Sequence, residues 1–363
     1  MRTLDELRRE IDEVDRGIKE LYLRRMSAVN EVAAYKMATG DAVYNPEREK
    51  QVLEAKADTY GLPDVYRTVM RRSREYQYCQ MIEQGAVTLP YVFADDMTVK
   101  TVYFQGIDGS YSSVAAKTLY PNANHVSVAA FSDVAQKVME DESAAGILPI
   151  DNSTEGSVNA TYDLMLRHDI YITKAITLDI RHCLAGCPGA SMETVRTITS
   201  HPQALAQCRR LTDRYVTVPA SNTAVAARDV ADMGDPTVAA ICSKEAAALY
   251  GLKILAEDIQ DSSANATRFA CLSKCLQKTG NTISLVLHLD HVVGSLAGLL
   301  PMFADYGVSL TKIQSRPIPD KRWEYCFYLD FDGSYDDPKV RALLFQLESE
   351  LPFVKLLGVY EHV

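Results

Sequence analysis

Arg25 and Lys36 are the first residues whose types and spacing suggest chemistry. They are eleven positions apart in a stretch with helical periodicity, so at about 100° per residue both side chains face nearly the same side of a helix. Arg25 takes a position that the surrounding repeat otherwise gives to apolar residues, and no acid lies at that spacing to pair with it. A buried charge without a partner is costly, and a bound anion would remove the cost. The simpler alternative is a coiled-coil tether in which Arg25 reaches solvent along its aliphatic stem.

A long helix must carry these two cations. Apolar residues recur with heptad spacing over residues 4–38, which contain one Gly and no Pro, so the sequence predicts a single helix about 50 Å long. Such a helix cannot bury its seam within one small domain, so we expect it to dimerise. Asn45-Pro46 predicts the start of a second helix, and a break at Gly61-Leu62-Pro63 leads to a third over residues 64–84. The seam comprises Leu4, Leu7, Ile11, Val14, Ile18, Leu21, Ala28, Val32 and Tyr35.

Further polar residues on these helices could face the same ligand. Arg8 precedes Arg25 by seventeen residues, which is roughly 26 Å along a helix, so it can serve the same pocket only from a second chain. Ser73 and Gln77 are four residues apart on the third helix and are therefore neighbours on one face. Donors from several helices around one pocket indicate a small anionic ligand.

Taken together, these residues resemble the all-helical chorismate mutase domain, which forms an intertwined dimer, over the whole of the first region. The resemblance implies that Arg8 from a second chain and Arg25 bind the carboxylates of chorismate. It also implies that Lys36 and Gln77 donate to the ether oxygen, where charge grows during rearrangement to prephenate, and that Glu49 accepts from the ring hydroxyl. The residues expected to contact this substrate are Arg8, Arg25, Lys36, Asn45, Arg48, Glu49, Ser73 and Gln77.

Residues 99–279 alternate short β-rich runs with helical stretches, which predicts an α/β domain. Small hydroxylated residues stand at three expected helix starts. Backbone N–H groups at such starts can bind anions, although each segment alone would be an ordinary N-cap. The three are GSYSS (109–113), the polar turn before a helix beginning near Ser157, and SNTAVAA (221–227); a further helix, over 202–215, is expected to open at His201-Pro202-Gln203.

These segments, with Thr267-Arg268-Phe269, resemble prephenate dehydratase. The resemblance implies two α/β lobes around a cleft, like a periplasmic binding protein. Prephenate would lose CO2 and hydroxide together, with Thr267 or a water that it orients protonating the leaving hydroxyl. Arg268 and the hydroxyl-rich turns would hold the carboxylates. Besides Thr267, the residues expected at this site are Ser110, Ser112, Asn152, Ser153, Thr154, Gln203, Thr223, Arg268 and Phe269.

Residues 280–363 begin with a strand and continue in the order βαββαβ, which predicts a ferredoxin-like module. Two segments, Gly294-Ser295-Leu296 and Gln314-Ser315-Arg316-Pro317, resemble those of the phenylalanine-binding ACT domain. The resemblance implies L-phenylalanine as an allosteric effector; the alternative is a dimerisation module without a ligand. The effector-binding residues expected are Gly294, Ser295, Leu296, Gln314, Ser315 and Arg316.

The composition limits the other possibilities. The chain has 363 residues, of which 47% are hydrophobic and 24% charged, as in globular proteins. A net charge of -10 without a basic run among aromatics argues against nucleic acid. Neither a signal peptide nor an apolar run long enough to span a membrane is present, so we expect a cytoplasmic location without membrane association. The eight cysteines lack the usual metal or redox spacings, and no nucleotide-binding motif occurs, so no cofactor or metal is expected.

The sequence thus predicts a homodimer or higher homo-oligomer of multidomain chains. It would convert chorismate through prephenate to phenylpyruvate, with feedback inhibition by L-phenylalanine. Two alternatives stay open: a dehydratase whose helical domain is catalytically silent, and a non-catalytic amino-acid sensor. The expected regions are an all-α mutase domain (1–84), a linker (85–98), a two-lobed α/β dehydratase domain (99–279) and an α+β ACT domain (280–363).

Overall fold

The chain forms two compact units, each built from two separate stretches of sequence. The first unit joins Met1–Tyr91 to Leu285–Lys355, and the second joins Val92–Ser284 to Leu356–Val363. The N-terminal helices and most of the C-terminal module therefore belong to the same unit, while the domain boundaries expected from the sequence stay predictions. The structure is a computed structural model that describes residues 2–95, 98–278, 280–318, 321 and 323–363.

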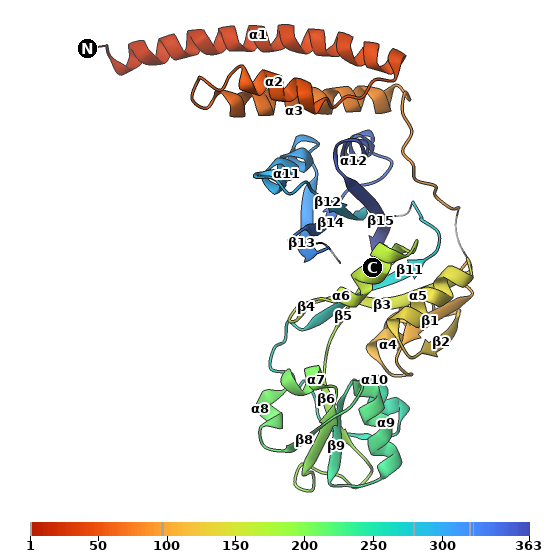
Figure 1. Ribbon diagram of the computed structural model, residues 1–363. Helices are drawn as coiled ribbons and strands as arrows, with labels where there is room; N and C mark the ends of the chain where they lie inside the picture. The colour runs from red at the N-terminus through yellow and green to blue at the C-terminus, as the bar shows by residue number, and fades with distance from the viewer. Residues whose placement is uncertain (1, 96–97, 279, 319–320, 322) are drawn as a thin grey trace. The chain divides into compact units, whose positions relative to one another are not determined.

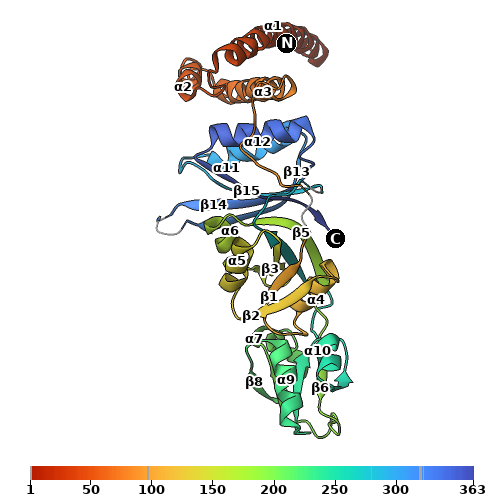
Figure 2. The ribbon, with the colours of Figure 1, turned by 90° about the vertical axis from the view of Figure 1, so that its right-hand side faces the viewer.

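Three helices form the N-terminal region, in the predicted order (Figures 1 and 2). α1 begins with a capping box in which the Thr3 hydroxyl accepts from the Glu6 amide and the Glu6 carboxylate accepts from the Thr3 amide. It ends at Gly40, whose φ of 77° is favourable for glycine. Asn45 caps α2 by accepting from the Arg48 amide at 3.0 Å. The helices are α1 Leu4–Thr39, α2 Pro46–Glu54 and α3 Leu62–Glu83.

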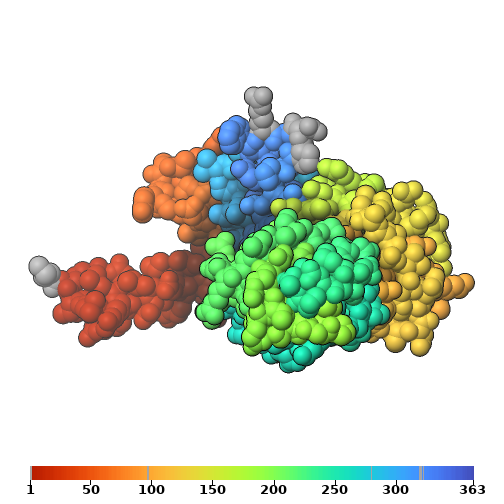
Figure 3. All heavy atoms as spheres, turned by 90° about the horizontal axis from the view of Figure 1, so that it is seen from below, coloured from red at the N-terminus to blue at the C-terminus, as the bar shows by residue number. Residues whose placement is uncertain are grey.

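Most of α1 is not covered by its own chain. Among its described residues only Val29 and Ala33 are buried. The seam residues from Leu4 to Leu21, in the red segment of Figure 3, are 39–67% exposed. Within the described part of the chain, no helix is both long and apolar enough to cross a membrane. A continuous apolar stripe is thus left without a partner in one chain.

The second unit has two α/β lobes. In the first lobe, the strands are hydrogen-bonded in the order β5-β11-β3-β1-β2, with β4 added to the end of β3. Three helices, α4 to α6, belong to this lobe (Figure 2). Its elements are β1 Thr101–Gln105, α4 Tyr111–Leu119, β2 Asn124–Val128, α5 Phe131–Glu140, β3 Ala144–Asn152, β4 Gly156–Ser157, α6 Asn159–Arg167, β5 Tyr171–Asp179 and β11 Ala266–Ser273.

The second lobe lies between β5 and β11 in the sequence, so the chain passes from the first lobe to the second and back. Its sheet has the order β10-β6-β9-β7-β8. Two α/β lobes are what the resemblance to prephenate dehydratase implied for this region. The elements are β6 Cys183–Gly186, β7 Thr197–Ser200, α7 Pro202–Ala206, α8 Arg209–Thr212, β8 Val216–Pro219, α9 Thr223–Met233, β9 Val238–Cys242, α10 Lys244–Leu249 and β10 Lys253–Ala256.

The C-terminal elements follow the predicted order βαββαβ. Their strands are arranged as β13-β14-β12-β15, so the first and third strands of the module lie in the centre and the second and fourth outside. This is the ferredoxin-like arrangement expected from the sequence. The elements are β12 Thr282–His288, α11 Ser295–Asp305, β13 Ser309–Pro317, β14 Tyr325–Asp332, α12 Pro338–Glu350 and β15 Phe353–His362.

The helix expected near Ser157 begins two residues later, and that prediction is wrong in detail. Ser157 belongs to β4 and pairs with β3, so α6 starts at Asn159. The amides of Thr154 and Glu155 donate to the Asn152 side chain, at 3.0 Å each. They are therefore satisfied within the turn and do not form an open anion site.

The helix expected over residues 202–215 is also broken. α7 closes at Gln207, whose amide bonds the carbonyls of both Gln203 and Leu205. Cys208 has a non-helical backbone before α8 begins. The break leaves Gln207 at the end of a short helix, where its side chain enters the site described below.

Candidate active sites

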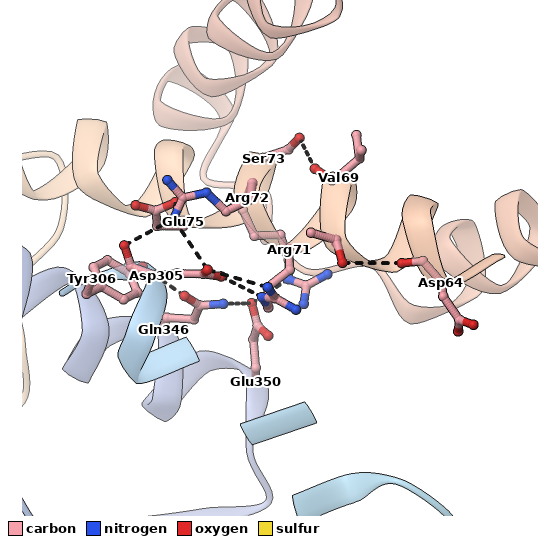
Figure 4. Close-up of polar contacts among 12 residues, drawn as sticks. Asp64, Val69, Arg71, Arg72, Ser73, Glu75, Asp305, Tyr306, Gln346 and Glu350 are labelled. Carbon is pink, nitrogen blue, oxygen red and sulfur yellow. Dashed lines mark hydrogen bonds and ion pairs between the residues drawn. The ribbon is translucent and has the colours of Figure 1, made fainter. Parts of the chain in front are cut away.

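Arg25, Ser73 and Gln77 come together between α1 and α3. Arg25 is half-buried and donates to the hydroxyl of the buried Ser73, which itself donates to the Val69 carbonyl at 2.7 Å (Figure 4). One turn further along α3, Gln77 is buried, and its Nε2 donates to the Ser73 carbonyl at 3.0 Å. Its Oε1 has no hydrogen-bond partner among the described residues. A buried acceptor without a donor is unfavourable, so this oxygen and the second amide hydrogen are available to a ligand.

Lys36 and Glu49 form a second group in the helical region. Lys36 is half-buried, and its Nζ donates to the Val43 carbonyl at 2.8 Å. Burial lowers the pKa of Lys36, while the charges of Asp41 and Glu49 act in the opposite direction. Glu49, near the start of α2, forms an ion pair with Arg74 of α3. A cation and an anion are thus held in a partly desolvated position.

The side chains of three other predicted residues have different contacts in a single chain. Arg8 is exposed and pairs with Asp5 at 3.6 Å. Arg48 is exposed, and the side chain of Asn45 serves as a helix cap. Because Arg8 and Arg25 lie on one continuous helix, roughly 26 Å separates them along its axis. One chain therefore supplies only part of the predicted substrate-binding set.

The second unit contains a cavity of about 290 Å³ that brings together most of the predicted dehydratase residues. Its walls come from both lobes, including the end of β3 and the starts of β11, α4, α7 and α9. Sequence segments more than a hundred residues apart therefore meet around one space. The predicted residues that line it are Ser110, Ser112, Asn152, Gln203, Thr223, Thr267 and Phe269.

The hydroxyl of Thr267 is oriented by Asn152. Asn152 Nδ2 donates to Thr267 Oγ1 at 2.9 Å. Asn152 Oδ1 accepts from the Thr154 and Glu155 amides and from the Thr154 hydroxyl, which fixes the amide so that its nitrogen faces Thr267. Because Thr267 Oγ1 already accepts this bond, its own hydrogen is free to donate to a molecule in the cavity.

A second tier of amide groups holds Asn152. Its Nδ2 also donates to Asn265 Oδ1 at 3.0 Å, and Asn265 Nδ2 donates to Gln207 Oε1 at 2.9 Å. The same Gln207 oxygen lies 3.2 Å from Nε2 of the buried His182. Since an amide oxygen can only accept, this histidine nitrogen carries hydrogen. Burial lowers the pKa of His182, so the ring is neutral at neutral pH.

The cavity is suited to an anion although none of its described lining residues is an Asp, Glu, Lys or Arg. α4 and α9 both begin at its wall, where Ser110 and Asn222 are the N-caps. The side chain of Ser110 accepts from the Ser113 amide, and the side chain of Asn222 accepts from the Val225 amide. The amides that precede these two in each helix have no intrahelical partner. Two positive helix ends thus face the cavity.

Three predicted dehydratase residues do not line the cavity. Ser153 donates to the Ala264 carbonyl at 2.5 Å, and Thr154 supports Asn152. Arg268 lies between Thr267 and Phe269 on β11, and neighbouring residues of a strand face opposite sides. It donates to Asp151 at 3.0 Å through Nε. Arg268 therefore does not line this cavity, and its expected contact with a substrate carboxylate stays a prediction.

The C-terminal module has a cavity of about 260 Å³ at the start of α11. Gly294, Ser295 and Leu296 line it, as the sequence predicted. The other predicted segment, Gln314 to Arg316, is in β13 and does not line this cavity. A single chain therefore brings only the first of the two expected segments to the cavity.

Sequence analysis missed several polar residues that the structure places at these sites. His182, Gln207 and Asn265 form the hydrogen-bonded group that holds Asn152, which in turn orients Thr267. Arg74 binds Glu49. Gln207 could have been found, because it follows Gln203 by four residues in a segment already recognised as a helix start. No local pattern marks the others.

Comparison with known proteins gives one family match for each of the two regions that contain these sites. The Prephenate dehydratase family matches residues 102–276, and the Chorismate mutase type II family matches residues 7–78. A prephenate dehydratase from Arthrobacter aurescens, solved in complex with L-Phe, is 31% identical with a TM-score of 0.66, covering 72% of this chain and 90% of its own. Arogenate dehydratase/prephenate dehydratase 1 of Arabidopsis thaliana is 37% identical over 73% of each chain.

One relative is similar over nearly its whole length. The bifunctional chorismate mutase/prephenate dehydratase of Neisseria gonorrhoeae is 34% identical, covering 99% of this chain and 98% of its own. The match covers both the helical region and the two-lobed unit of this chain. The chain therefore belongs to the family of bifunctional chorismate mutase/prephenate dehydratases.

Proposed function

We propose that the chain rearranges chorismate to prephenate in its helical region and converts prephenate to phenylpyruvate, CO2 and water in the cavity of the second unit. Neither step requires a metal or an organic cofactor. The first is a pericyclic rearrangement, and the second is driven by aromatisation of the ring. The observation that carries the proposal is the cavity where two helix N-termini and the free hydrogen of Thr267 face one space.

The helical region is suited to hold chorismate in a reactive conformation. Arg25 provides a guanidinium for one carboxylate, which it can bind through two hydrogen bonds. Lys36 and Gln77 donate to the ether oxygen and stabilise the negative charge that develops there. Glu49 accepts from the ring hydroxyl through the oxygen that does not bind Arg74. Holding the substrate in one compact conformer supplies the rest of the rate enhancement.

A second copy of the chain would complete this site. The seam of α1 from Leu4 to Leu21 is exposed in one chain, and heptad seams of this kind bury their residues against another helix. Antiparallel pairing would bring Arg8 of one chain near Arg25 of the other, which the separation along α1 forbids within one chain. We therefore propose a homodimer as the smallest active form of the mutase.

In the dehydratase cavity the carboxylates of prephenate would bind the free amides of α4 and α9. Decarboxylation breaks a carbon–carbon bond, and its electron pair enters the ring as the carbon–oxygen bond to the ring hydroxyl breaks. The departing hydroxide takes a proton, because hydroxide is a poor leaving group. Thr267, or a water that it orients, donates to this oxygen, while Asn152 and the amides behind it hold the hydroxyl in place.

The cavity favours prephenate over arogenate, the substrate named for several relatives. Arogenate carries an ammonium group where prephenate has a ketone. No carboxylate is present among the described residues that line the cavity, so an ammonium group would lose its hydration without gaining an ion pair. We therefore propose prephenate as the substrate.

The C-terminal module is proposed to be an ACT domain that binds L-phenylalanine at the start of α11. Support comes from the cavity at Gly294 to Leu296 and from the related prephenate dehydratase that was solved with L-Phe. Inhibition would follow if the less active state binds the amino acid more tightly. The cytoplasmic location expected from the sequence stays a prediction.

One assay separates this function from its two alternatives. Purified protein is incubated with chorismate, and chorismate loss and phenylpyruvate are followed; a parallel sample is acidified to convert any released prephenate. Phenylpyruvate formed without acid supports the bifunctional enzyme. Turnover of added prephenate alone indicates a silent helical domain, and turnover of neither compound indicates a sensor.

A further inference from the structure

Arg74 contacts two carboxylates from different regions of the first unit. Its Nη1 donates to Glu49 of α2, and its Nε donates to Oε1 of Glu350, the last residue of α12, at 2.8 Å. The side chains of Arg74 and Glu350 are only 13% and 7% exposed. The guanidinium also lies 4.9 Å from the ring centroid of Tyr44. One buried cation is therefore shared between the proposed mutase site and the C-terminal module.

The oxygen of Glu350 that accepts from Arg74 also accepts from a short chain of hydrogen bonds. Gln346 Nε2 donates to Glu350 Oε1 at 3.0 Å, and Tyr306 donates to Gln346 Oε1 at 2.8 Å (Figure 4). Glu350 ends its helix, where the helix dipole disfavours an acid. Arg74 offsets that disadvantage, and the fixed Glu350 in turn determines which edge of the guanidinium is left for Glu49.

Because Arg74 binds two carboxylates at once, its contact with Glu49 is limited. A guanidinium can bind both oxygens of one carboxylate through two parallel hydrogen bonds. Here Nε is bound to Glu350, which fixes the orientation of the guanidinium, and Arg74 makes a single hydrogen bond to Glu49, from Nη1 to Oε1. The second oxygen of Glu49 makes no hydrogen bond among the described residues. That oxygen is the one available to a substrate hydroxyl.

We propose that Arg74 is a positioning residue of the mutase site, and that Glu350 of α12 keeps one oxygen of Glu49 free for the substrate by fixing the orientation of the Arg74 guanidinium. The inference rests on the proposed mutase function and on the place of Glu49 in it. It makes the affinity of the helical region for its substrate depend on a residue of the C-terminal module.

The structure also contains a matched control. Asp305 ends α11 and binds Arg71 of the same helix α3 (Figure 4). Like Glu350 it is a nearly buried acid, 12% exposed, paired with an arginine of α3. Within the described part of the chain, neither Asp305 nor Arg71 makes a hydrogen bond or ion pair with Glu49, so a change there disturbs the same helix packing without freeing Arg74.

The test compares Glu350→Gln with Asp305→Asn in the full chain. Glu350→Gln removes the charge that fixes the guanidinium through Nε, so Arg74 can turn toward Glu49 and bind both of its oxygens. We expect the KM for chorismate to rise about tenfold, the size of one hydrogen bond to a charged group, with kcat changed less than about twofold. Asp305→Asn should leave both constants near those of the wild type. Turnover of added prephenate in each variant confirms that the chain is folded.

A second measurement separates positioning from a general loss of structure. In an Arg74→Met background, Glu350→Gln should no longer change the KM, because no guanidinium is left to bind Glu49. An equal rise in the presence and absence of Arg74, or an equal effect of Asp305→Asn, would overturn the inference. A wild-type chain that converts prephenate but not chorismate would instead overturn the proposed mutase function, and the inference with it.

Discussion

Asn152 donates its amide hydrogen to the hydroxyl oxygen of Thr267 across 2.9 Å. Three donors hold the other end of the same amide, so Asn152 cannot turn round to accept from Thr267 instead. The direction of this one hydrogen bond makes Thr267 a donor toward the cavity. The proposed chemistry of the second unit depends on that direction.

Replacing Thr267 by Ala should lower kcat for phenylpyruvate formation by about a hundredfold or more, because the donor to the departing oxygen is removed. Thr267→Ser keeps the hydroxyl and should retain most of the activity. Both are measured with prephenate by the absorbance of phenylpyruvate. A Thr267→Ala rate within about twofold of the wild type would contradict the assignment.

Asn152→Asp changes the direction of the hydrogen bond while keeping the shape of the side chain. The carboxylate would accept from Thr267, so the hydroxyl hydrogen would no longer point to the substrate. We expect kcat for the dehydratase to fall about a hundredfold, with a smaller change in KM. Asn159→Asp at the exposed start of α6 is the control; equal losses in both variants would argue against the role of Asn152.

Gln77→Glu should make the mutase dependent on acid. A glutamine amide donates at any pH, whereas a glutamic acid donates only while it is protonated. Position 77 is buried, and burial raises the pKa of a carboxyl group. Mutase activity of the variant should therefore be present at about pH 5 and lost by about pH 8, while the wild type serves as the control. Equal activity of the variant at both values would refute the role of Gln77.

A mixture of two inactive variants should recover mutase activity if the site is shared between chains. Arg8→Ala and Arg25→Ala each damage both sites of their own homodimer. In a heterodimer one site carries both changes and the other carries neither. After mixing and re-equilibration, about one quarter of the wild-type activity is expected. No recovery, with mixed dimers isolated through a different affinity tag on each variant, would show that Arg8 does not act across the interface.

Prephenate should be used more efficiently than arogenate. We expect kcat/KM to differ by about tenfold or more, because the ammonium group of arogenate meets neutral amides and hydroxyls in the cavity. The comparison uses the same enzyme preparation with each substrate. Similar values for the two would show that the neutral lining does not select between them.

The elements that the sequence predicted well are those defined by local chemistry. The heptad pattern predicts α1, which lies between the caps Thr3 and Gly40. Both caps form hydrogen bonds with groups of α1 that are only three or four residues away. The start of α6 was misplaced because Ser157 pairs with β3. That pairing depends on a strand whose other neighbour, β11, comes more than a hundred residues later. A single-sequence pattern carries no record of it.

The residues of the two sites were likewise predictable only where local sequence spacing places them together. Ser73 and Gln77 could be placed together because helix periodicity sets their neighbourhood. Asn265 and Gln207, by contrast, are 58 residues apart, and Arg74 and Glu350 are 276 apart. Neither pair has a characteristic spacing, because the fold alone brings the partners together.

The exposed apolar stripe of α1 means that the two proposed activities should depend differently on the concentration of the protein in the cell. A cavity built within one chain works as soon as that chain has folded, so its output grows in proportion to the number of polypeptides made. A pocket that requires two chains to meet grows roughly with the square of that number while copies are scarce. In a cell that makes little of the enzyme, the rate of the mutase reaction would therefore be low relative to the rate of the dehydratase reaction. The ratio of the two rates would rise as more enzyme is made.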